Sequence, residues 1–387
     1  MAKKRLERRQ KGYEAYKKNA GRIALVASVL GLGFVLASVV NEAFGLRAAF
    51  WESASSKTKD ITPYLRETMI PHFTHALFLL FLYLAILLGA LFFLYGRLGF
   101  KQYACSSLIV ASLFGFVKPV LAIYDDSKTL KETIIKINDA LAKGENPPFP
   151  SVKEYLLKEF IPRYMGDIAL IMILLGVIVV AVYFLTDSET MKRIGFSEIL
   201  VGGFSGAVGK GMTLYFIVPR IKSFVDMVDS YIAAGQGQQI GYGSVEEFVG
   251  QEVVPLLLDN ISSILLFLGA CLLALYLIWK IHWGKSAGGI AFILGGFLAA
   301  FGVFLQTAFL SIKLRGEIGT VRQALQGGQS YKVFLGEWGL DVSSMLGYFT
   351  RKFIPYYLDQ FSTALFYAAI MILALYVIKK TSLLDNV

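Results

Sequence analysis

Of the 387 residues, 56% are hydrophobic and only 17% are charged, and the mean hydropathy is +0.59. This exceeds what a soluble domain of this length needs for its core, so the composition predicts an integral membrane protein. The formal net charge of +10 is explained by basic residues beside the apolar segments. The basic N-terminal segment has few aromatic side chains to stack on bases, so we expect no nucleic acid partner.

Eight apolar segments are long enough to form membrane-spanning helices, because about 20 residues of helix cross about 30 Å of hydrocarbon. In chain order they cover residues 23–44, 76–95, 103–124, 168–185, 199–218, 261–279, 288–312 and 361–378. The predicted fold class is therefore an all-α integral membrane protein with eight transmembrane helices.

Basic residues mark one side of the predicted membrane. Nine lysines and arginines precede the first segment, but that segment is long and lacks a clear cleavage site, so a retained helix is favoured over a signal peptide. Further basic residues in the short connections are Arg97, Lys101, Lys192, Arg193, Lys280, Lys285, Lys379 and Lys380. The positive-inside rule then predicts a cell-membrane protein with both termini cytoplasmic and the long connections outside.

One pattern of residues occurs four times, around Pro71, Pro162, Pro255 and Pro355. Eleven positions before these prolines stand Asp60, Ser151, Ser244 and Ser344, and seven positions before them stand Tyr64, Tyr155, Phe248 and Tyr348. Serine and aspartate are good helix N-caps, and Glu154 and Glu247 complete capping boxes in two copies. The pattern predicts a short surface helix that turns its aromatic residue toward the membrane boundary and bends at a proline hinge into the next span.

The four copies predict four tandem repeats of two spans each. The predicted organisation is a basic segment 1–22, repeats 23–96, 97–187, 188–281 and 282–380, and a tail 381–387. An even number of crossings gives every repeat the same orientation, which predicts a pseudo-fourfold axis along the membrane normal rather than inverted repeats. Amphipathic stretches at 127–151, 221–237 and 316–330 predict an additional outer layer of helices.

Several polar residues fall inside or beside the apolar segments. Matching short glycine-containing strings places Leu36, Lys118, Lys210 and Gln306 at one level of the odd-numbered spans, with Lys210 close to mid-span. Four or five positions after the prolines stand His75, Asp167, Asp259 and Asp359. Lys118 and Asp167, and likewise Lys210 and Asp259, are 49 positions apart, which predicts two ion pairs. They could be structural pairs or part of a polar path, and Lys118 could instead snorkel to the interface.

Small residues dominate the odd-numbered spans and predict close helix packing. Gly202 and Gly206, or Gly295 and Ala299, are four positions apart, a spacing that lets backbones approach in lipid. We expect these spans to form an inner ring, although packing alone explains the glycines. Cys105 and Cys271 both lie in spans and are expected to pack as small apolar residues without forming a disulfide.

No pattern of catalytic or cofactor-binding residues is present in the sequence. The string at 206–211 lacks the Walker glycine and Ser/Thr, and the string at 240–243 resembles a potassium filter only once, in a polar connection. His72 and His75 could share a metal, but the remaining histidine, His282, lies on the predicted opposite side. We therefore expect no enzyme, no cofactor and no metal.

Two functions remain compatible with the sequence. The first is a channel or transporter-like protein that passes a small ion or solute along the odd helices, with anions slightly favoured by Lys118 and Lys210. The alternative is a non-catalytic structural or assembly subunit that docks through its outer helices. Expected partners are anionic lipid headgroups at the cytoplasmic face, and another copy or another membrane protein.

Overall fold

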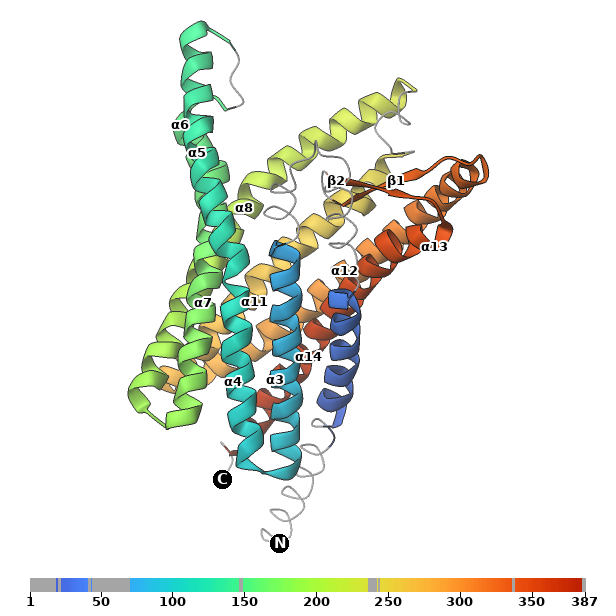
Figure 1. Ribbon diagram of the computed structural model, residues 1–387. Coiled ribbons are helices and arrows are strands. Elements are labelled where there is room, and N and C mark those ends of the chain that lie inside the picture. Colours follow the sequence, from blue (N-terminus) through green and yellow to red (C-terminus); the bar gives the residue numbers. More distant parts are fainter. Residues whose placement is uncertain are drawn as a thin grey trace. The chain divides into compact units, whose positions relative to one another are not determined.

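The computed structural model describes residues 22–40, 70–145, 149–235, 242, 244–335 and 338–384, together with residues 19 and 43 (Figure 1). The chain divides into two compact units. Unit 1 comprises Met1–Val117 and Val303–Ile372, and unit 2 comprises Lys118–Gly302 and Leu373–Val387.

Helices account for nearly all of the described residues, which confirms the predicted helical class. The helices are α3 (Ile70–Tyr95), α4 (Leu98–Gly115), α5 (Val117–Lys143), α6 (Val152–Tyr155), η2 (Leu156–Phe160), α7 (Ile161–Thr186), α8 (Glu189–Ala233), α10 (Val245–Phe248), η3 (Val249–Val253), α11 (Val254–Trp279), α12 (His282–Gln326), α13 (Met345–Tyr348), η4 (Phe349–Phe353) and α14 (Ile354–Leu384). The sequence did not predict the antiparallel hairpin of β1 (Tyr331–Leu335) and β2 (Trp338–Val342), in which Leu335 pairs with Trp338.

Six helices in the described part of the chain are long and apolar enough to cross a membrane. They are Arg22–Val40, Phe73–Phe92, Leu98–Lys143, Val152–Thr186, Val245–Trp279 and His282–Gln326. Together with the composition, they indicate a multi-pass membrane protein. The other two predicted spans, 199–218 and 361–378, lie in α8 and α14, so the count of eight stays a prediction.

The same local structure precedes α7, α11 and α14. A serine N-cap accepts a hydrogen bond from the backbone N–H three positions later, a single α-helical turn follows, and a five-residue π-helical turn leads into the proline. The capping bonds join Glu154 N–H to Ser151 at 3.1 Å, Glu247 N–H to Ser244 at 3.2 Å, and Gly347 N–H to Ser344 at 3.1 Å. The predicted serine caps are thus confirmed in three copies. The Asp60 and Tyr64 positions of the remaining copy lie outside the described residues.

The π-helical turns explain how these helices accommodate a proline. Proline has no N–H, so a regular α-helix through it leaves a carbonyl of the preceding turn without a donor. Here the residue before each proline donates to the carbonyl five positions back, as Ile161 does to Leu156 and Val254 does to Val249. Such turns are a known way to fit an irregularity into a helix. The predicted bend at the proline is therefore a widened turn in a continuing helix.

Left-handed residues divide the chain into pieces of equal length. Gly96, Asp187 and Lys280 have φ values of 68°, 52° and 58°, and each lies 25 positions after a proline of the repeated pattern. Gly144, Gly235 and Gly328 have φ values of 71°, 71° and 74°, and each lies a further 48 positions on. We call the pieces 71–144, 162–235 and 255–328 hairpins 1, 2 and 3. The end with the left-handed turn between the two helices is the turn end, and the opposite end is the proline end.

Glycines set the register between the two helices of hairpins 2 and 3. The contacts are Gly195 to Val180, Gly202 to Ile173 and Gly209 to Met165 in hairpin 2, and Gly288 to Leu273, Gly295 to Leu266 and Gly302 to Leu258 in hairpin 3. A Cβ placed on Gly202 would lie 3.0 Å from the backbone nitrogen of Ile173, so only glycine fits this approach. Every contact in hairpin 3 lies 93 positions after its counterpart, so both hairpins pack in the same register.

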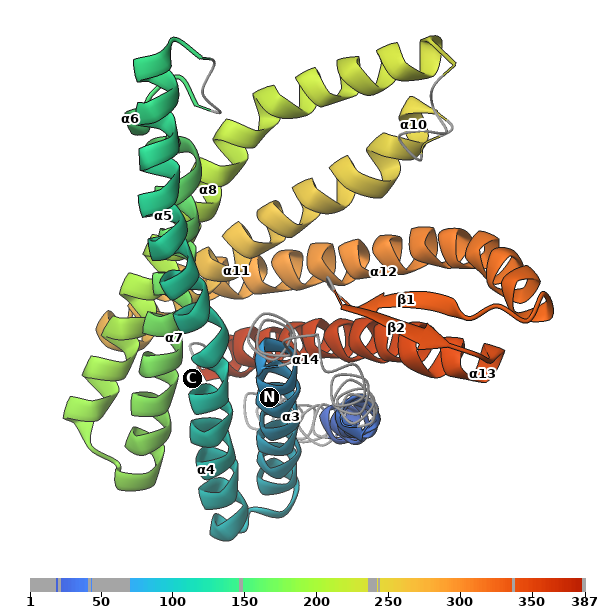
Figure 2. The ribbon, with the colours of Figure 1, turned by 45° about the horizontal axis from the view of Figure 1, so that its top comes forward.

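In unit 2, α8 lies between α7 and α11 (Figure 2). Its second glycine face contacts α11, because a Cβ on Gly203 would lie 2.9 Å from the backbone nitrogen of Cys271. Pro219 lies inside α8, where a proline bends a helix, and the remaining part of α8 leads away from α7.

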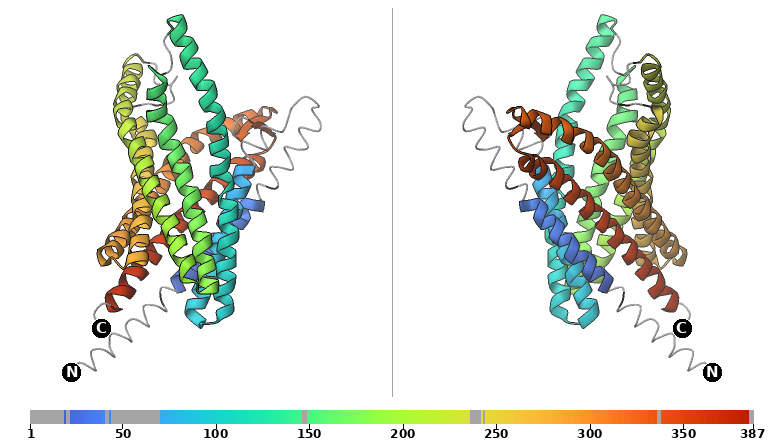
Figure 3. Two further views of the ribbon diagram at one scale, coloured as in Figure 1. Left: turned by 90° about the vertical axis from the view of Figure 1, so that its left-hand side faces the viewer. Right: turned by 90° about the vertical axis from the view of Figure 1, so that its right-hand side faces the viewer.

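In unit 1, helix 22–40 lies beside α3 and α14 (Figure 3, right). Gly31 faces the Tyr83 ring of α3, and Phe34 stacks on Phe361 of α14 with ring centroids 5.9 Å apart. The buried Tyr83 hydroxyl donates a 2.5 Å hydrogen bond to the carbonyl of Ser362. The first described helix is therefore held by the second and by the last.

Candidate functional site

The Lys210–Asp259 pair lies at the proline end of unit 2. Lys210 follows the turn residue Asp187 by 23 positions, which is about 34 Å along a helix. Helix α8 stays helical over 45 residues, from Glu189 to Ala233, so Lys210 lies about midway along a helix that is longer than the predicted span 199–218. The predicted depth of Lys210 in the membrane stays a prediction.

Of the two predicted ion pairs, one has its partners in contact. Lys210 Nζ lies 3.5 Å from Asp259 Oδ2, and the two side chains are 32% and 59% exposed. No ion pair joins Lys118 to Asp167 in the part of the chain that the structure describes. The Lys118 side chain is exposed, while Asp167 lies within electrostatic reach of Arg163 and of both lysines.

The packing of hairpins 2 and 3 contradicts the prediction that Lys210 and Gln306 lie at one level of their helices. Equivalent contacts in hairpins 2 and 3 lie 93 positions apart, so Gly302 corresponds to Gly209 and not to Gly206. By the same offset, Val303 corresponds to Lys210 and Gln306 corresponds to Thr213. Lys210 and Gln306 therefore do not share a level. The sequence alignment was displaced by three positions because glycines are so frequent in these helices that several local alignments fit.

The remaining predicted polar residues have separate surroundings. The His75 ring stacks on Phe78 at 6.1 Å, and Gln306 and Asp359 are exposed. The backbone carbonyls of Asp259 and Asp359 accept hydrogen bonds from Ser262 and Ser362 at 2.9 and 2.8 Å. These equivalent bonds agree with the equal positions of the two aspartates after their prolines.

A chain of four charges that the sequence reasoning missed joins α5, η2, α7 and α8. Arg163 lies 3.2 Å from Asp126 and 3.5 Å from Glu159, and Arg220 lies 3.2 Å from the other oxygen of Glu159. The Arg220 guanidinium also lies 5.8 Å from the centre of the Phe149 ring. Glu159 and Arg163 are four positions apart, a recognisable helix pair, whereas their partners come from other helices and could not be found by spacing.

The side chains of this charge chain are partly exposed. The Arg163 side chain is 57% exposed and Glu159 is 35% exposed, whereas Asp126 is only 12% exposed. Ion pairs that are this open to solvent each add little stability. The four charges therefore link α5, η2, α7 and α8 at the proline end of unit 2 without a large energetic contribution from any single pair.

Aromatic pairs cover the capped turns. The pairs are Phe149–Tyr155 and Tyr242–Phe248 with ring centroids 5.1 Å apart, and Tyr331–Tyr348 at 6.1 Å. Tyr155 and Tyr348 are 6% and 0% exposed, which corrects, for these two copies, the prediction that the cap aromatic turns toward the membrane boundary. They pack inward because each connection supplies a second aromatic ring; in unit 1 Tyr348 also packs in one cluster with Val321 and Val342.

Two tyrosine hydroxyls at the proline end donate to glutamates. Tyr242 donates to Glu252 and Tyr331 donates to Glu317, each at 2.9 Å. Burial first, and then the bond to Glu252, raise the pKa of Tyr242 to about 12. The same causes, with Glu317, raise the pKa of Tyr331. Both phenols therefore keep their protons and remain donors at physiological pH; Lys352 is the further partner of Glu317.

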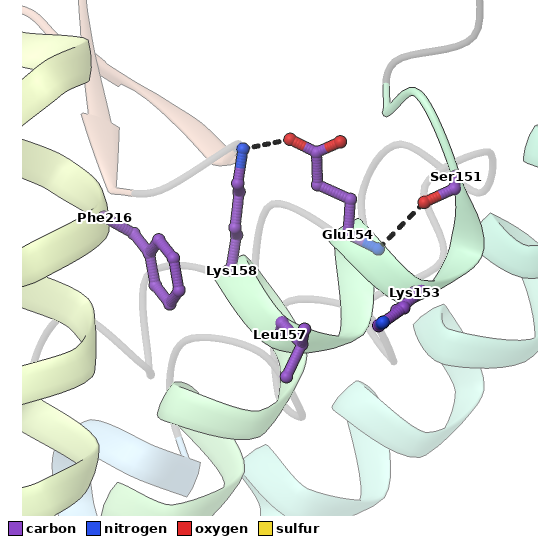
Figure 4. A pocket seen from close by; sticks show the side chains of 6 residues that line it. All are labelled: Ser151, Lys153, Glu154, Leu157, Lys158 and Phe216. Carbon is purple, nitrogen blue, oxygen red and sulfur yellow. Dashed lines mark hydrogen bonds and ion pairs between the residues drawn. The ribbon is translucent and has the colours of Figure 1, made fainter.

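A pocket of about 280 Å³ lies where the first capped turn, which consists of Ser151, α6 and η2, meets α8 (Figure 4). It is lined by Ser151, Lys153, Glu154, Leu157, Lys158 and Phe216. Lys158 forms an ion pair with Glu154, whose backbone N–H is the donor to the Ser151 cap. The pocket therefore combines an apolar floor with a charged rim.

Other kinds of site find no support in the described part of the chain. No group of three or more His, Cys, Asp or Glu side chains there could hold a metal ion, and Cys105 and Cys271 are buried free thiols. No protein-family model, no curated protein and no solved structure matches this chain.

Proposed function

We propose that the chain forms four two-span repeats around a pseudo-fourfold axis in a cell membrane, with the turn end and both termini in the cytoplasm. The equal lengths of hairpins 1 to 3 support the repeats. The ring is supported by helix 22–40, which packs against both α3 and α14, as α8 packs against both α7 and α11. Arg97, Lys101 and Lys192 near the left-handed turns support the orientation.

The orientation can be tested by labelling single cysteines in intact cells. A Ser188→Cys variant carries its thiol at the turn end, and a Ser127→Cys variant carries it at the proline end. With Cys105 and Cys271 replaced by alanine, an impermeant maleimide should label Cys at 127 alone. Labelling at 188 alone would reverse the orientation.

We infer that the protein serves as a structural or assembly subunit of a larger membrane complex. The observation that carries this proposal is the length of α8, which continues from Lys210 to Ala233, about 35 Å along the helix. With the turn end at one membrane surface, Lys210 lies near the far boundary of the hydrocarbon core, and most of this length projects beyond it. A path for a solute does not need such a projection, whereas a docking surface does. Phe224 and Met227 on the projection are 53% and 44% exposed.

The docking role can be tested by photo-crosslinking in the native membrane. A photoreactive residue at Phe224 or Met227 should give a defined crosslinked product. The control position is Phe204, which is 61% exposed but lies in the membrane-embedded part of the same helix, where lipid is the expected neighbour. Lipid adducts alone at all three positions would contradict a docking role.

Passage of an ion or solute is the second candidate, and the Lys210–Asp259 pair favours it. Two charged side chains that are partly exposed at the hydrocarbon boundary are costly unless water or a partner reaches them. If the pair lines a path, anions should be favoured, and Lys210→Glu should shift the reversal potential of reconstituted bilayers toward cations. Ion flux from the pure protein that responds to this substitution would replace the assembly role with transport.

A further inference from the structure

The pocket at the first capped turn combines features of a site for a lipid headgroup. Leu157, 39% exposed, and Phe216 of α8 provide apolar surface, whereas Ser151, Lys153 and Lys158 provide hydrogen-bond donors (Figure 4). Glu154 neutralises Lys158, so Lys153 leaves the rim with a net positive charge. An amphiphilic pocket of this kind suits a ligand with a negative group and a hydrocarbon chain.

The depth of the pocket matches the headgroup layer. Phe216 follows the turn residue Asp187 by 29 positions, about 43 Å along a straight helix. A bilayer including its headgroups is about 40–45 Å thick. With the turn end at one membrane surface, the pocket therefore lies among the headgroups of the opposite leaflet.

The second capped turn does not share this positive charge. The position 93 after Phe216 is again a phenylalanine, Phe309, so the aromatic residue is retained in the next hairpin. Lys153 and Lys158, however, correspond to Glu246 and Gln251. The second capped turn has the opposite charge and offers a comparison site within the same chain.

We propose that this pocket binds the phosphate group of an anionic phospholipid in the leaflet at the proline end. Lys153 and Lys158 contact the phosphate, and Leu157 and Phe216 contact the first carbons of the acyl chains. The apolar floor and the depth favour a lipid over a free phosphate ion. The proposal depends on the membrane placement given above and is independent of the docking role.

The binding can be measured by native mass spectrometry of the full-length protein in detergent, titrated with phosphatidylglycerol and, separately, phosphatidylcholine. We expect phosphatidylglycerol to bind more tightly. Because a basic residue near an anionic lipid surface contributes about 1 kcal/mol, Lys153→Gln and Lys158→Gln should each weaken it about fivefold. Lys128→Gln, an exposed lysine on α5, is the matched control and should leave the affinity unchanged.

A second arm separates lipid from free phosphate. Leu157→Asn removes the apolar contact at an exposed position, so it should weaken phosphatidylglycerol binding without changing the elution volume. Inorganic phosphate at millimolar concentration should not displace the lipid. Displacement by phosphate with no effect of Leu157→Asn would assign the pocket to a soluble phosphate compound instead. Equal lipid binding by the wild type and both lysine variants would overturn the proposal.

Discussion

The three hairpins and the connections that follow them differ in how constant their lengths are. Each hairpin extends 73 positions from its proline to its final left-handed glycine, whereas the connections from that glycine to the next proline span 18, 20 and 27 positions. One added residue would rotate half of a helix by about 100° and remove its glycines from the contact face. A connection tolerates added residues at little cost, and the longest one contains the β1–β2 hairpin.

The largest effect should come from a change of length inside a hairpin. One alanine inserted between Leu200 and Val201 turns Gly202 and Gly209 away from α7 while Gly195 stays in place. We expect no monodisperse protein in detergent by size-exclusion chromatography. The same insertion after Gly235, in a connection, should leave the elution profile unchanged. Equal tolerance of both insertions would contradict the contrast between hairpins and connections.

A substitution at one glycine contact should have the next largest effect. Gly202→Leu forces a side chain against the α7 backbone, where even a Cβ would lie 2.8 Å from the carbonyl oxygen of Ala169. Overpacking of this kind costs about 1–3 kcal/mol or more, read as a lower midpoint of thermal unfolding. The control is Gly211→Leu on the same helix, where no atom lies within 4 Å of an added Cβ. A similar decrease in the unfolding midpoint at both positions would mean that the destabilisation does not come from contact with α7 but from helix propensity.

Removing a serine cap should have a smaller and local effect. Ser244→Ala removes the acceptor for the Glu247 N–H, 3.2 Å away, which typically costs about 1 kcal/mol. We expect faster hydrogen exchange in α10 and η3 and an unchanged rate in α11 near the turn end. Ser244→Asp keeps an acceptor and should restore protection. Faster exchange throughout α11 would show that the capped turn and the hairpin unfold together.

The smallest effect should come from the Lys210–Asp259 pair. Both side chains are partly exposed, so solvent screening limits the coupling energy to about 0.2–1 kcal/mol. A double-mutant cycle with Lys210→Met and Asp259→Asn, followed by chemical unfolding, measures it. A coupling of several kcal/mol would show that the pair is buried in the assembled protein.

The sequence predicted features that depend on neighbouring residues better than features that depend on packing. Serine caps were recognisable because the acceptor and its donor lie three positions apart. The π-helical turns were not, because nothing in the residues before Pro162 requires a five-residue hydrogen bond. The partners of the Arg163 chain were missed because they lie on other helices, as with Glu159 and Arg220, 61 positions apart.

The register of the long helices was the main error in the candidate site. Glycines three and four positions apart give several equally good local alignments, and only the neighbouring helix selects among them. Lys210 was therefore placed beside Gln306, although the contacts of Gly209 and Gly302 show that Lys210 corresponds to Val303. Helix length was underestimated for a similar reason. A hydropathy window ends where polar residues begin, whereas α8 continues as a helix through such residues to Ala233.

The bond between Tyr83 and Ser362 has a consequence for biosynthesis. Its partners are 279 positions apart, and a ribosome adding roughly 5–20 residues per second needs roughly 14–56 s to synthesise that length. During this time helix 22–40 and α3 have already left the ribosome, but α14, against which both pack, does not yet exist. Unit 1 can therefore be completed only after α14 has been synthesised. A chain that stalls before α14 leaves the Tyr83 hydroxyl without its native acceptor, the carbonyl of Ser362.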